Sequence, residues 1–195
     1  MKITAPISAH PPRRDSTMST HDRPQFAGLG ESRVGIRAVL QERPSKYMML
    51  MSFAQEILRE DSHLSAVDRE VIAAYTSKLN GCEYCCGSHT EFATSLGASD
   101  TDRAMIESGV TDGHRLAALL AYVKKLTLTP SAISESDKQA VHAAGFSEEE
   151  LKDAIAVCAA FNLFNRIVEG HGIAPHESYV QDAKMINTHG YDRRR

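Results

Sequence analysis

Apolar residues recur every three or four positions along most of the chain after about residue 30. This spacing places them on one face of an α-helix, whereas the alternation typical of a half-buried strand is not sustained over a strand's length anywhere. The pattern therefore predicts an all-α protein with a single helical domain.

The predicted helices of the first half are bounded by serine, glycine and proline. A serine hydroxyl can accept a hydrogen bond from a free N–H of the first turn, and proline suits the first position of a helix. The Asn80-Gly81 pair is a natural helix stop. We therefore expect helices over residues 33–41, 45–60, 65–80 and 82–97, and a short helix that starts at Ser99.

The second half contains two further capping patterns. Ser134 with Asp137, and Ser147 with Glu150, each place an acid three residues after a serine, so that two first-turn N–H groups can be satisfied. We expect an apolar helix over 112–128, a short helix after Ser134, and the longest helix from Ser147 to about residue 170. Apolar residues surround this longest helix, which indicates a central position.

The chain divides into three parts by composition. Residues 1–30 have prolines at positions 6, 11, 12 and 24 among polar residues and show no hydrophobic period, so we expect a flexible extension. Residues 31–172 carry the helical pattern and form the predicted domain. Residues 173–195 are a C-terminal tail whose conformation the sequence leaves open.

Charge and hydropathy argue against nucleic acid and against a membrane. The chain has 195 residues and a formal net charge of −3 at pH 7, and its short arginine runs are not interleaved with aromatic residues. No stretch approaches the roughly 18 to 20 apolar residues that span a bilayer, and the polar opening lacks the apolar core of a signal peptide. We therefore expect a cytoplasmic protein.

Three of the four cysteines are clustered, at positions 82, 85 and 86. This distribution differs from the dispersed framework of a secreted disulfide scaffold. In a reducing compartment such a cluster indicates redox chemistry or metal binding.

Cys82, Cys85 and His89 fall within one narrow stripe of a helix that starts at residue 82, because each residue advances the helix by about 100°. The positive end of the helix dipole and an imidazole both favour the thiolate form of a cysteine. Cys85 would thus be activated, and a sulfenic acid on Cys85 could condense with Cys82 to form a disulfide.

Other interpretations of the cysteines stay open. Cys86 could serve as an alternative disulfide partner, although packing as a small buried hydrophobe is favoured. A structural zinc site needs four ligands, and Cys158 lies far along the chain in an apolar helix. The three cysteines could also be purely structural and only pack in the core. In that case the spacing of Glu70 and His89 relative to them would be a coincidence.

The spacing around the cysteines matches a known pattern. Glu70 lies twelve residues before Cys82 (82 − 70), and His89 lies four residues after Cys85 (89 − 85). This pattern, with its Asn-Gly lead-in, resembles the alkylhydroperoxidase D and carboxymuconolactone decarboxylase-like superfamily. The resemblance extends over about residues 30–172, with specific motifs in 65–97.

The resemblance implies a function and roles for these residues. Cys85 matches the peroxidatic cysteine, Cys82 the resolving cysteine, and His89 with Glu70 the proton relay that activates the thiol. A carboxylate that orients an imidazole, which in turn activates a nucleophile, is consistent with this assignment. The implied activity is hydroperoxide reduction.

The resemblance also suggests partners. We expect an external dithiol donor, such as a lipoylated protein or a thioredoxin-like protein, and a homo-oligomer, whether dimer, trimer or hexamer. No metal, flavin or haem is required. The alternatives are a lactone decarboxylase, which would need acid/base groups without a thiol pair, and a non-enzymatic redox sensor or zinc module.

Overall fold

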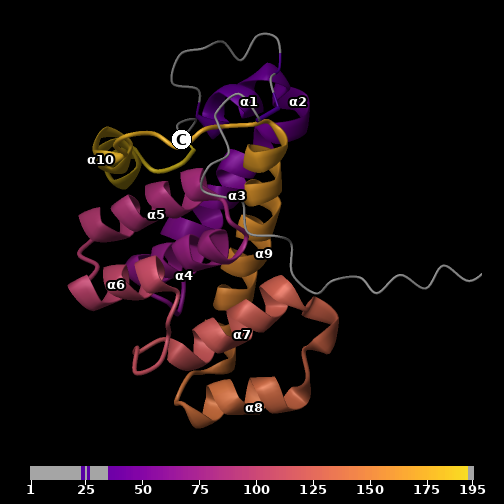
Figure 1. Ribbon diagram of the computed structural model, residues 1–195, viewed down its shortest axis with the longest axis vertical. Coiled ribbons are helices and arrows are strands. Elements are labelled where there is room, and N and C mark those ends of the chain that lie inside the picture. Colours follow the sequence, from indigo (N-terminus) through magenta and orange to yellow (C-terminus); the bar gives the residue numbers. More distant parts are fainter. Residues whose placement is uncertain (1–22, 25, 27–34, 193–195) are drawn as a thin grey trace, which may run out of the picture.

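The computed structural model describes residues 23, 24, 26 and 35–192 (Figure 1). Helices joined by short connections make up most of this part of the chain, and none of the described residues is in a β-strand. The predicted all-α class is confirmed.

The helices follow one another closely along the chain. Those of the first half are α1 (Ile36–Glu42), α2 (Pro44–Tyr47), α3 (Met49–Arg59), α4 (Ala66–Leu79), α5 (Glu83–Ser95) and α6 (Asp100–Ser108). Those of the second half are α7 (Ala117–Leu128), the 3₁₀ turn η2 (Pro130–Ala132), α8 (Glu135–Ala143), α9 (Glu148–Gly170) and α10 (Val180–His189).

The predicted capping residues start their helices as expected. The Ser65 hydroxyl accepts a hydrogen bond from the backbone N–H of Asp68, and Ser99 and Ser147 each form a complete capping box. At the start of α8, the Asp137 carboxylate accepts the backbone N–H of Ser134 at 2.8 Å. Each box satisfies two first-turn donors with two neighbouring side chains. These local signals fix where α4, α6, α8 and α9 begin.

Two predicted helices have different limits. The expected helix over 45–60 is divided at Met48 into the single turn α2, which buries no residue, and α3, which buries an apolar stripe. The helix expected from residue 112 begins only at Ala117. Gly113 has a positive φ of 75°, which interrupts the helical path, and the His114 ring accepts the N–H of Leu116 at 3.2 Å.

The most enclosed helix is α4. All of its residues from Arg69 to Ser77 are buried, and it packs against α5, α7 and α9. The longest helix, α9, runs along one side of the bundle (Figure 1) and leaves Leu163 42% exposed. The central position expected for α9 is therefore held by α4, which carries Glu70.

The C-terminal segment, whose conformation the sequence left open, contains α10. This helix lies beside α5 (Figure 1), and Tyr191 just after it is buried. The expected extension over residues 1–30 lies outside the described residues, except for 23, 24 and 26. Within the part that the structure describes, no helix has both the length and the apolar character needed to cross a membrane.

Candidate active site

The cysteines lie at the turn between α4 and α5. Gly81 adopts a φ of 70°, which reverses the chain, and Cys82 is the N-cap of α5 rather than a residue of its first turn. The backbone N–H of Cys82 donates to the Ser77 carbonyl at 3.0 Å, and its carbonyl accepts from Cys86 at 2.9 Å. Both sulfurs of the motif are thus held at the positive end of a helix.

Cys82 and Cys85 are free thiols in the protein interior, with exposed fractions of 0% and 3%. A hydrogen bond to Cys85, together with burial, raises the pKa of Cys82 far above its ordinary value. Cys82 therefore stays a protonated thiol at neutral pH.

The other two cysteines have separate surroundings. Cys86 is half-buried and packs against the core, and burial is the main reason that its pKa is raised. Cys158 lies on α9, where its sulfur is 3.3 Å from the Thr127 hydroxyl. No three His, Cys, Asp or Glu side chains of the described ranges are grouped so that they could hold a metal ion.

Glu70 and His89 meet across the α4–α5 hairpin. His89 Nδ1 lies 2.5 Å from Glu70 Oε2, although the two residues are 19 positions apart in the chain. Glu70 is fully buried and His89 is 8% exposed. The structure thus brings together the acid and the imidazole that the spacing singled out.

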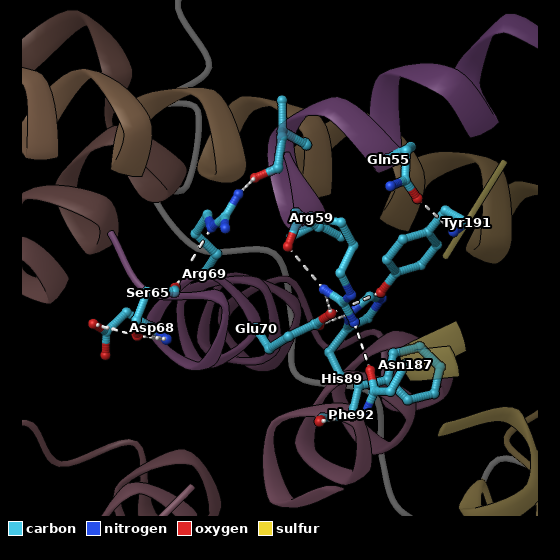
Figure 2. A network of polar contacts seen from close by, with 12 residues as sticks. Gln55, Arg59, Ser65, Asp68, Arg69, Glu70, His89, Phe92, Asn187 and Tyr191 are labelled. Carbon is cyan, nitrogen blue, oxygen red and sulfur yellow. Dashed lines mark hydrogen bonds and ion pairs between the residues drawn. The ribbon is translucent and has the colours of Figure 1, made fainter. Parts of the chain in front are cut away.

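Two further residues, which the sequence analysis did not identify, contact the same carboxylate. Arg59 Nη1, at the end of α3, lies 2.6 Å from Glu70 Oε1, and the Tyr191 hydroxyl donates to this oxygen at 2.8 Å. Figure 2 shows Arg59, His89 and Tyr191 pointing toward Glu70. An arginine in the last turn of a helix is explained by the helix dipole alone, so no local signal marked it.

The network sets the charge of each member. Burial alone would raise the pKa of Glu70. Contacts with His89, Arg59 and Tyr191 lower it by more than burial raises it, so the pKa of Glu70 is below its ordinary value. Burial and the adjacent carboxylate raise the pKa of Tyr191 well above 10.0. At neutral pH Glu70 is therefore a carboxylate, and Tyr191 is a neutral hydrogen-bond donor.

Aromatic rings fix the orientation of His89. Its ring meets Phe161 edge-on at a centroid distance of 4.4 Å and Phe92 at 5.1 Å, and it is stacked on Tyr191 at 6.4 Å. With Glu70 on Nδ1, these contacts leave the imidazole little freedom to rotate.

A small cavity of about 60 Å³ adjoins Cys85 and His89. Aliphatic and aromatic side chains dominate its wall, which includes no lysine and no arginine. It is lined by Ile36, Leu40, Met51, Ala54, Leu58, Tyr84, Cys85, His89, Phe161, Phe164 and Tyr191. Cys82 does not line it, so Cys85 is the motif sulfur that a small molecule in this cavity would meet.

Comparison with known protein families identifies a domain within this helical arrangement. Residues 45–125 match the model of the carboxymuconolactone decarboxylase family. The chain contains a carboxymuconolactone decarboxylase family domain. The match spans α2 to α6, most of α7 and the Cys-x-x-Cys turn. The resemblance drawn from the cysteine motif is confirmed at the level of the family.

Solved structures share the fold of this carboxymuconolactone decarboxylase family domain. One similar structure is the alkylhydroperoxidase core of an uncharacterised peroxidase-related protein from Ralstonia eutropha JMP134. The TM-score is 0.68 and the sequence identity is 23%, and the match covers 74% of this chain and 78% of that chain. An uncharacterised peroxidase-related protein from Silicibacter sp. TM1040 has a TM-score of 0.64 and a sequence identity of 22%, and the match covers 82% of this chain and 92% of that chain. The sequence matches none of the curated proteins with which it was compared.

Proposed function

We propose that this protein is a thiol-dependent peroxidase that reduces hydroperoxides at Cys85. The observation that carries the proposal is that Cys85 and His89 line one small apolar cavity while Glu70 holds the far side of the same imidazole. This arrangement offers a nucleophile, a base and a group that orients the base. The peroxidase-related neighbours and the shared fold support the proposal.

The first step is attack of Cys85 on the peroxide. His89 takes the thiol proton on Nε2, the nitrogen that Glu70 leaves available, and Glu70 stabilises the imidazolium that forms. The thiolate then bonds to the terminal peroxide oxygen and the O–O bond breaks. Cys85 becomes a sulfenic acid, and the departing alkoxide takes the proton from the His89 imidazolium and leaves as an alcohol.

The second step forms the disulfide. The Cys82 sulfur attacks the sulfenic sulfur of Cys85, and water leaves with the thiol proton of Cys82. An external dithiol, on a lipoylated or thioredoxin-like protein, then reduces the disulfide by exchange and is itself oxidised to a disulfide. The cycle balances with one dithiol consumed for each peroxide reduced.

Steady-state peroxide consumption tests the proposal. The purified chain is assayed with dihydrolipoamide, thioredoxin and glutathione as parallel donors. We expect turnover with at least one dithiol, loss of turnover in Cys85→Ser, and retention in Cys158→Ser, which changes a buried cysteine away from the cavity. A reversible disulfide with no turnover on any donor would instead support the redox-sensor alternative.

Lactone decarboxylation is the second candidate, because the family model is named for it. A substrate that loses carbon dioxide brings a carboxylate, and the cavity wall has no cationic side chain except His89 when it is protonated. A carboxylated lactone offered to the Cys82→Ser/Cys85→Ser double variant separates the two functions. Turnover by this variant would favour the decarboxylase.

A further inference from the structure

Each oxygen of the Glu70 carboxylate has its own partners. Oε2 lies against His89, whereas Oε1 receives both the Arg59 guanidinium and the Tyr191 hydroxyl. A carboxylate held at one oxygen in this way cannot rotate without losing two charge-assisted contacts. Its other oxygen is therefore presented to the imidazole in one orientation.

We propose that Tyr191 is a positioning residue of the active site, and that the C-terminal residues 190–192 complete the site by holding the Glu70 carboxylate toward His89. The inference rests on the proposed role of Glu70 and His89 in activating Cys85. It adds to the site a segment that lies more than a hundred residues from the cysteine motif in the chain.

One face of α3 holds this segment in place. Ser52, Gln55 and Arg59 are spaced three and four residues apart, so they lie along one side of the helix. Ser52 donates to the Asp192 carboxylate, and Gln55 Oε1 accepts the backbone N–H of Tyr191 at 2.8 Å. The Arg59 guanidinium lies 5.0 Å from the centre of the Tyr191 ring.

Gly190 makes this path possible. Its φ of 72° is in the left-handed region, and a Cβ there would lie 2.3 Å from Gln55 Oε1. The absence of a side chain lets the backbone approach α3 closely enough for Tyr191 to enter the core. Tyr191 is only 6% exposed as a result.

The hydroxyl of Tyr191 affects the chemistry as well as the packing. The charged and titratable groups that face Glu70 are His89 from α5, Arg59 from α3, Tyr191, and Arg69 from α4 itself, whose guanidinium also bonds to the carbonyl of Glu60. Loss of the Tyr191 hydroxyl leaves Oε1 held by Arg59 alone, so the carboxylate can turn its other oxygen away from Nδ1 and then supports a protonated His89 less well. The Cys85 thiolate then forms at higher pH.

The test is the pH profile of Cys85 alkylation by iodoacetamide, localised by mass spectrometry, in Tyr191→Phe. Phenylalanine keeps the ring and removes only the hydroxyl. We expect the midpoint to move up by about one pH unit, with the same shift in the acid limb of peroxide consumption. Tyr122→Phe, a half-buried tyrosine on α7, is the matched control and should leave both profiles unchanged.

Gly190→Ala provides a second variant that keeps the hydroxyl but displaces it from Glu70. It should move both midpoints in the same direction. The inference is overturned if both variants fold and their pH profiles match those of the unmodified chain. If Tyr191→Phe does not fold, the profile of Gly190→Ala alone decides. The alkylation profile needs no turnover, so a chain that consumes no peroxide would refute the proposed function and still test Tyr191.

Discussion

Glu70 and His89 are joined by a 2.5 Å contact between two neighbouring helices that the turn at Gly81 folds against each other. The contact joins a carboxylate that is wholly out of solvent to an imidazole at the edge of a cavity. Since the carboxylate is also compensated by Arg59, its charge can be kept in the core. The structure therefore places an ionised carboxylate against the imidazole that lines the cavity together with Cys85.

Glu70→Gln should slow the reaction of Cys85 with peroxide by about 10² to 10³-fold at neutral pH, because the amide cannot stabilise an imidazolium. Single-turnover stopped-flow measures this rate. Glu107→Gln, an exposed acid on α6, is the control and should react at the normal rate. Equal rates in the Glu70→Gln protein and the unmodified chain would show that the carboxylate takes no part in activating the thiol.

The same variant should be less stable by about 3 kcal/mol at neutral pH, because it leaves the Arg59 guanidinium, whose side chain is only 11% exposed, without its counter-charge. The pKa of Glu70 in the folded chain is below its ordinary value of 4.5, so ionised Glu70 stabilises the fold above that pH. This contribution is lost as the pH falls below 4.5 through the folded value. Urea unfolding at several pH values should show the difference between the two proteins shrinking toward acid pH.

Met51→Ala should enlarge the cavity and change the preferred substrate. Met51 lines the cavity and is 6% exposed, so its truncation leaves space beside Cys85. We expect a rise in the rate with cumene hydroperoxide relative to hydrogen peroxide, at a cost of about 2 to 5 kcal/mol in stability. Met105→Ala, a buried methionine on α6 that does not line the cavity, should have a similar cost and an unchanged rate ratio.

Ser65→Ala should lower stability by about 1 kcal/mol, because the α4 N-cap then no longer accepts the Asp68 N–H. Thermal unfolding with circular dichroism measures the loss. Peroxide turnover at a temperature where both proteins are folded should be the same. A large drop in turnover would mean that the start of α4 has a closer link to Glu70 than the contacts indicate.

Local signals in the sequence were sufficient for much of the fold. Ser65, Ser99 and Ser147 start helices because each cap depends only on residues within one turn. The Glu70–His89 contact could also be predicted from the sequence, since both residues lie in one helical hairpin whose turn is marked by Asn80-Gly81. The family motif supplied the spacing.

Arg59 and Tyr191 could not be found in the same way. They reach Glu70 from α3 and from the chain after α10, so only the tertiary packing of these elements brings them together. No periodicity relates residue 191 to residue 59. A Gly before a Tyr near the chain end was the sole local sign, and it is common to many helix ends.

The proposed cycle requires that peroxide oxidises Cys85 and that Cys82 resolves it. The most direct measurement is to add one equivalent of hydrogen peroxide to Cys82→Ser in the presence of dimedone and to locate the adduct by peptide mass spectrometry. We expect an adduct on Cys85 in this variant and, in the unmodified chain, a Cys82–Cys85 disulfide with no adduct. An adduct on Cys86 or Cys158, or none at all with both motif thiols still free, would contradict the proposed cycle.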